Sequence, residues 1–208
     1  MLKKINQKSI SQLTLVLIFS MFCLWSIPVF AGTPQGGNSP EAVFKAAQKA
    51  SANKDFSTLT NLVAPSEHAM MAFGTDFGVG MIVEFFEGEK AAALKKKYEK
   101  IQKKYKVKDL DDDKKLKITQ DTPQEVIDEH MRKRATKKFG HVDAMKYVPE
   151  LLGLVMNMPE MAGRSIVPQE KLTDLKIKGN HATGKAGDED VSFIREGGRW
   201  YLTGEIMD

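Results

Sequence analysis

The sequence has little cysteine, and this limits its chemistry. Cys23 is the one cysteine among 208 residues, so an internal disulfide is excluded and stability must come from a packed core. Histidine is also scarce, and the four histidines form neither an i, i+4 pair nor an HExxH motif, which gives no support for a metal site built from them. With 42% hydrophobic and 28% charged residues, the chain has the composition of a globular protein.

The N-terminus has the pattern of a secretory signal. An apolar run from Leu13 to Trp25 follows a lysine-containing start, and small residues end at Ala31. We expect cleavage after Ala31, which makes Gly32 the first residue of the exported protein, periplasmic or extracellular. Two alternatives stay open, an uncleaved anchor and lipidation at Cys23. The residues just before Cys23 are larger than a lipidation motif requires.

Removal of residues 1–31 would change the charge balance. This segment holds three lysines and no acidic residue, so the net charge would fall from +4 to +1. A nearly neutral chain gives no support for specific nucleic-acid binding. The remaining length fits one domain. We therefore expect a signal peptide over 1–31, a flexible leader over 32–38 and a single domain over 39–208.

Helical patterns fill the first two thirds of this domain. Ser39-Pro40-Glu41 predicts a helix start, with Ser39 as the cap, and a second short helix begins near Phe56. Residues 66–106 predict helix with a break at the three glycines Gly74, Gly78 and Gly80. Further helices are expected from the start signal Asp121-Thr122-Pro123 to Phe139, and over about 142–156.

The pattern changes at Glu170, where apolar and polar residues begin to alternate. Four short segments follow, separated by Gly-Asn, Gly-Asp and Gly-Gly turns at hairpin spacing. The alternation places Trp200 and Leu202 on the core face of the last strand and Tyr201 on the other face. Helices first and an antiparallel sheet last predict an α+β fold, with N-terminal helices and a helical insertion at about 65–169 packed on a curved C-terminal sheet.

Two stretches resemble the nuclear transport factor 2-like superfamily, in the small secreted bacterial branch built on a cystatin-like cone. SPEAVFKAAQKASANKDFSTLTNLVAP looks like its opening helices, and LTDLKIKGNHATGKAGDEDVSFIREGGRWYLT looks like its closing strands. The helical insertion between them departs from that pattern. The resemblance implies a conical pocket between sheet and helices that holds small ligands.

Acidic residues serve proton transfer or hydrolysis in some members of this superfamily. Here Glu205 and Tyr201 share a strand face and could reach such a pocket, with Asp190 as another candidate. A carboxyl group in an apolar pocket has a raised pKa and exchanges protons near neutrality. The alternative is that all three side chains lie exposed on the outer face of the sheet.

Two other segments suggest binding chemistry. Met156, Met158 and Met161 form MNMPEM, and thioethers bind Cu(I), although methionine also fills irregular core gaps.

Between Glu89 and Lys106 the chain has eight lysines and two glutamates. This segment either binds an anionic surface or forms a helix face that is simply exposed to water. The candidate positions for such a surface are Lys95, Lys96, Lys103 and Lys104, off an apolar seam that contains Ala91, Leu94, Tyr98, Ile101 and Tyr105.

These patterns favour a secreted or periplasmic, non-catalytic binding module for a small ligand or an envelope protein, with no cofactor. The alternative is a small-molecule isomerase or hydrolase of the ketosteroid isomerase or SnoaL-like kind, which would use the conical pocket. An apolar cavity with an inward carboxylate would favour the enzyme, whereas a core filled by Phe193 and Trp200 would favour the binding module.

Overall fold

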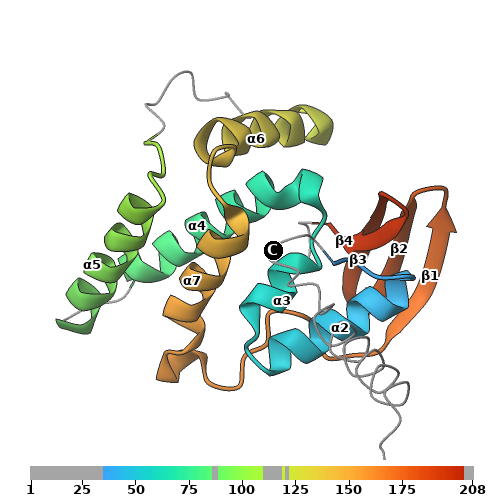
Figure 1. Ribbon diagram of the computed structural model, residues 1–208, viewed down its shortest axis with the longest axis horizontal. Helices are drawn as coiled ribbons and strands as arrows, with labels where there is room; N and C mark the ends of the chain where they lie inside the picture. Colours follow the sequence, from blue (N-terminus) through green and yellow to red (C-terminus); the bar gives the residue numbers. More distant parts are fainter. Residues whose placement is uncertain (1–34, 86–88, 110–118, 120–121, 204–208) are drawn as a thin grey trace, which may run out of the picture. The chain divides into compact units, whose positions relative to one another are not determined.

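The protein has an α+β fold in which helices precede a four-stranded antiparallel sheet (Figure 1). The computed structural model describes residues 35–85, 89–109, 119 and 122–203. The expected cleavage site at Ala31, the lipidation alternative at Cys23 and the candidate Glu205 therefore lie outside the described residues. No helix in these described ranges is long and apolar enough to cross a membrane.

The first two helices form the expected hairpin. Helix α2 (Pro40–Ala52) begins as predicted, because the Ser39 hydroxyl accepts a hydrogen bond from the Ala42 amide at 3.2 Å. Helix α3 (Phe56–Asn61) begins after Asp55, whose carboxylate accepts a hydrogen bond from the Thr58 amide at 3.0 Å. Burial of one face of each helix holds this pair against the rest of the domain.

The sheet has the order β1-β2-β3-β4, so each strand pairs with its neighbour in sequence. The turns between strands use glycines with positive φ, such as Gly179 and Gly197, a conformation that glycine adopts without a steric penalty. Strand β1 has an irregular register between Thr173 and Lys176. The strands are β1 (Leu172–Lys178), β2 (His181–Ala186), β3 (Glu189–Glu196) and β4 (Arg199–Leu202).

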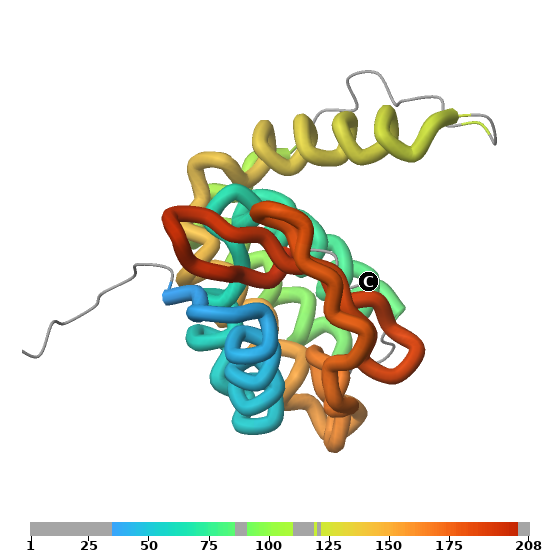
Figure 2. Tube along the Cα trace, turned by 90° about the vertical axis from the view of Figure 1, so that its right-hand side faces the viewer, coloured from blue at the N-terminus to red at the C-terminus, as the bar shows by residue number. Residues whose placement is uncertain are grey.

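The outer edge of β4 is covered by two other segments of the chain. Gly37, within the expected leader, exchanges two backbone hydrogen bonds of 2.8 Å with Trp200. The Leu202 amide donates to the Leu62 carbonyl at 2.8 Å, and the Leu202 carbonyl accepts from Ala64 at 2.9 Å. Figure 2 shows the chain after residue 34 running beside β4. These contacts satisfy an edge that would otherwise be open to pairing with another strand.

The insertion consists of helices α4 (His68–Phe85), α5 (Glu89–Lys104), α6 (Gln124–Phe139) and α7 (Ala144–Met156). The predicted break at the three glycines is wrong, because α4 runs through Gly74, Gly78 and Gly80 without interruption. Each helical glycine costs about 1 kcal/mol relative to alanine, and burial of four apolar α4 side chains, Met71, Ala72, Val79 and Val83, outweighs that cost. Gly80 also has a packing role, since a Cβ there would lie 3.3 Å from the Tyr98 hydroxyl.

The core continues from the sheet into the helices. Trp200 and Leu202 are buried as predicted, together with Phe193 and Val191 from β3. These side chains belong to the same apolar cluster as the buried faces of α2, α4 and α7. The connection from α7 to β1 is held against α2 through Ser51, whose hydroxyl oxygen accepts a hydrogen bond from the Ile166 amide at 2.9 Å.

Candidate functional site

A buried carboxylate connects the four helices of the insertion. The Asp76 side chain on α4 is 5% exposed, and its Oδ2 accepts a hydrogen bond from Lys138 Nζ of α6 at 2.8 Å. Its Oδ1 accepts from the Tyr147 hydroxyl of α7 at 2.5 Å and from the Tyr98 hydroxyl of α5 at 2.9 Å. Gln102 Nε2 donates to the same oxygen at 3.0 Å and to the Tyr98 hydroxyl at 2.8 Å. We call these five residues the Asp76 network.

The Asp76 network favours one fixed protonation state. Burial alone would raise the pKa of Asp76, but hydrogen bonds from Lys138, Tyr147 and Gln102 and the Lys138 charge outweigh burial and lower that pKa. Burial and the neighbouring carboxylate raise the pKa of Tyr147 and of Tyr98. An ionised Asp76 with four donors is a weak base, so the network is suited to holding helices together rather than to proton transfer.

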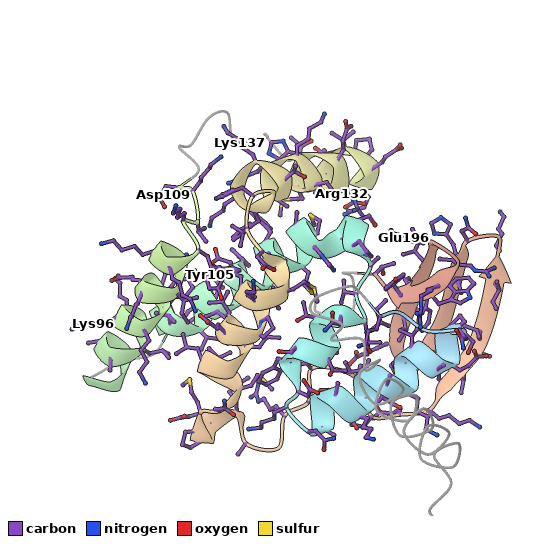
Figure 3. The ribbon with its side chains drawn as sticks, in the orientation of Figure 1. Lys96, Tyr105, Asp109, Arg132, Lys137 and Glu196 are labelled. Atoms are coloured by element: carbon purple, nitrogen blue, oxygen red, sulfur yellow. The ribbon has the colours of Figure 1, made fainter. Side chains whose placement is uncertain are left out.

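Aromatic rings extend this connection between α5, α6 and α7. The Tyr105 ring packs edge-on against Tyr147, with ring centroids 5.3 Å apart, and Phe139 lies 5.6 Å from Tyr147 on another side. Lys104 forms an ion pair with Glu150 of α7. Figure 3 shows Tyr105 close to α7 and Lys96 on the opposite side of α5. Helix α5 is therefore held by one side and presents the other side to solvent.

The solvent side of α4 is apolar. Phe77, Met81 and Phe85 recur every four residues and are 63%, 40% and 76% exposed. Gly74 is exposed on the same side and has open space before it. We call Gly74, Phe77, Met81 and Phe85 the α4 apolar face. Most water-facing helices carry charged and polar residues on that side, so this face is a candidate binding surface.

The lysine-rich helix has the packing that its sequence predicts. Leu94 is buried, and Tyr98, Ile101 and Tyr105 pack against the core, so the apolar seam is confirmed. The four candidate lysines are exposed. Of these, Lys104 is bound to Glu150, which leaves it less suited to a partner than the others. The exposed lysines of α5 with described side chains are Lys95, Lys96, Lys97, Lys100, Lys103 and Lys104.

The three methionines of MNMPEM line two different grooves. Met156 and Met161 line a groove of about 350 Å³ between α4 and α7, whereas Met158 lines a separate groove of about 510 Å³ between α5 and α7. Met156 is buried and packs in the core, which fits the gap-filling alternative. No group of three histidine, cysteine, aspartate or glutamate side chains is placed to hold a metal within the described ranges.

Asp190 and Tyr201, the described catalytic candidates on the sheet, have different surroundings. Asp190 is 82% exposed on the outer face, and its carboxylate lies 3.7 Å from Lys185 Nζ on the neighbouring strand. Tyr201 is 5% exposed and lies on the face opposite Trp200, where a Cβ at Gly36 would come within 2.7 Å of its ring. On the core face, Phe193 and Trp200 are buried within the main cluster.

The sequence patterns did not lead us to predict the Asp76 network or the α4 apolar face. Asp76 lies within GTDFGVG, where a single acid in an apolar helix was a usable signal for a buried charge. The α4 apolar face also has a signal in the sequence, since Asp76 is the one charged residue between positions 69 and 83, which leaves apolar residues on the water-facing side of the helix.

None of the protein-family models, curated proteins or solved structures compared with this chain matches it. The resemblance to the nuclear transport factor 2-like superfamily therefore stays a prediction from its residues.

Proposed function

We propose that the protein is an exported, non-catalytic binding module, and that it binds its partner through the α4 apolar face. In this proposal the nuclear transport factor 2-like core formed by the sheet and α2 carries the helical insertion. The signal-like N-terminus supports export, since the lysine-containing start, apolar run and small-residue end occur in the required order.

The exposure of Phe77, Met81 and Phe85 is the observation that carries the proposal. A large apolar side chain has about 200 Å² of surface, so the exposed fractions add up to roughly 350 Å² of apolar area. The largest apolar patch on a typical monomeric protein covers about 300–600 Å² and is often functional, so an area of this size fits a binding surface.

The support of α4 adds to this argument. The Asp76 network joins α4 to the three other insertion helices, and Asp76 lies next to Phe77 in sequence. The apolar face is therefore held by a rigid framework and needs little ordering when a partner binds, which reduces the entropic cost of association.

The enzyme alternative has less support. It needs a carboxylate in an apolar pocket, and Asp190 is instead exposed and next to Lys185. The buried carboxylate of Asp76 is occupied by four donors, and its pKa is lowered rather than raised. Neither group has the environment of a general acid or base that works near neutral pH.

Site-specific photo-crosslinking in cells that export the protein tests the proposal. A photoreactive phenylalanine analogue would replace Phe77 or Phe85, one variant at a time, and Lys178 on β1 would be the control position. Lys178 is also exposed but lies on the sheet. We expect irradiation to yield adducts of lipid or protein from the two α4 positions, detected as a shift in mass.

The control position should give far less product. Equal yields at Phe77, Phe85 and Lys178, or no adducts at all, would contradict the proposal, because a true binding surface is occupied in the cell. Adducts to a second copy of the chain would support a binding role in which the partner is another molecule of the same protein.

A further inference from the structure

The surroundings of the α4 apolar face indicate which kind of partner it fits. The next helix, α5, exposes Lys95, Lys96, Lys100 and Lys103, and Glu99 is the one acidic side chain described on it. Within α4 itself, Glu84 is exposed near the apolar side chains. Over residues 68–104 the sequence has seven lysines and five acidic residues, a net charge of +2, so the hairpin of α4 and α5 combines an apolar surface with a small excess of positive charge.

Contacts between the two helices hold these surfaces together. The Tyr98 hydroxyl donates to Asp76, and Gln102 donates to the same carboxylate. The hydroxyl of Tyr98 also lies next to Gly80, where a Cβ would come within 3.3 Å of it. Lysines of α5 and apolar residues of α4 thus belong to one helical hairpin.

This combination matches the surface of a bilayer that contains anionic phospholipid. Phenylalanine and methionine side chains enter the boundary between headgroups and acyl chains, while lysines remain at the level of the headgroups and attract their negative charge. Phe77 and Phe85 are eight positions apart, about 12 Å along the helix, so they can enter such a boundary together with Met81 between them. Phenylalanine and methionine are common in protein interfaces as well, but lysine is depleted there, so the lysines of α5 favour an anionic lipid surface over a protein partner.

We infer that the α4 apolar face and the exposed lysines of α5 bind the protein peripherally to a membrane rich in anionic phospholipid. This inference rests on the proposed function and names its partner. Binding at the interface does not require a spanning helix, and none is found in the described ranges.

Co-sedimentation with vesicles tests this inference. The full exported chain would be mixed with vesicles of phosphatidylglycerol and phosphatidylcholine, and with vesicles of phosphatidylcholine alone. We expect binding to the anionic vesicles that weakens steeply as salt rises, because the Debye length falls from about 10 Å at 0.1 M to about 3 Å at 1 M. Binding to the neutral vesicles should be at least about 100-fold weaker, since each lysine near an anionic surface contributes about a fivefold change in affinity.

Two pairs of variants separate the apolar part from the charged part. The double variant F77S/F85S should lose about 100-fold or more in vesicle affinity, whereas I177S on β1 should bind like the wild type. Ile177 is a suitable control because it is 58% exposed but lies on the sheet. The double variant K95E/K103E should lose about 30-fold or more, whereas K176E/K178E, with the same change of charge, should lose much less.

The outcomes separate this inference from the proposed function. No binding of the wild type to anionic vesicles at low salt would overturn the inference about lipid. Equal losses in the α5 and β1 lysine variants would also overturn it, because overall charge would then explain the binding. If vesicle binding is absent while Phe77 still crosslinks to a protein in cells, the partner is a protein and the proposed function stands.

Discussion

Replacing Lys138 with Met removes the cation that pairs with Asp76 among the described residues, while keeping most of the side-chain volume. Loss of one partner from a buried ion pair costs about 3–5 kcal/mol, because the other charge is left without compensation. The Lys138 side chain is 20% exposed and that of Asp76 is 5% exposed, so solvent reduces the effect somewhat. We expect K138M to lower the free energy of unfolding by about 2–4 kcal/mol.

A double-mutant cycle shows whether this loss comes from the charge pair. In the D76N background there is no carboxylate for Lys138 to neutralise, so the second change K138M should cost at least about 1 kcal/mol less than it does in the wild type. The matched control is K133M on the same helix. Lys133 is 73% exposed and pairs with Glu129 within α6, so its loss should cost less than about 0.5 kcal/mol.

The pH dependence of D76N gives a second readout. Because the pKa of folded Asp76 lies below the ordinary value of about 3.9, its ionised form stabilises the fold fully above that value. This stabilisation is lost as the pH falls through the folded pKa. The difference in stability between the wild type and D76N should therefore be constant from about pH 6 to 8 and shrink below about pH 5.

Urea denaturation followed by circular dichroism measures all of these differences. The slopes of the unfolding curves should stay equal among the variants, so that shifts of the midpoint report stability. A K138M variant as stable as the wild type, or K138M and D76N effects that simply add, would refute the assigned role of the Asp76 network.

Three further predictions concern the core, the sheet surface and processing. Replacing the buried Trp200 with Ala should cost about 3–5 kcal/mol, and a near-neutral result in thermal denaturation would mean that its packing is misassigned. D190N should change stability by less than about 0.5 kcal/mol, because Asp190 is exposed; a larger loss would reveal a role that its single contact with Lys185 does not explain. Mass spectrometry of the exported protein should find Gly32 at the N-terminus, and recovery of the intact precursor in membranes would contradict cleavage.

Local signals allowed much of the fold to be predicted from the sequence. Ser39 and Pro40 start α2 by capping and by the fixed backbone of proline, both of which act within one helical turn. Turns that contain glycine and the alternation of apolar and polar residues predicted the strands and placed Trp200 on the core face of the sheet. Such signals work because the residues that decide the structure are close together along the chain.

The break predicted in α4 failed because packing outweighed local preference. Gly74 and Gly78 weaken a helix by themselves, but the buried side of α4 packs against α6 and α7, and that gain depends on residues far away in sequence. The sequence signalled a buried charge at Asp76, but the partners of that carboxylate were unpredictable for a related reason. Its donors at Tyr98, Lys138 and Tyr147 come from three helices, and no short motif connects them.

The central claim is that the α4 apolar face enters an anionic membrane surface, and a spin label at Met81 tests it most directly. The exported chain is expected to have no cysteine, so M81C gives a single labelling site, and K178C on β1 is the control. With vesicles that contain phosphatidylglycerol, power saturation should show the label at Met81 becoming accessible to oxygen and protected from an aqueous nickel reagent. The label at Lys178 should remain in water. A label at Met81 that stays equally accessible to the nickel reagent with and without vesicles would contradict the claim.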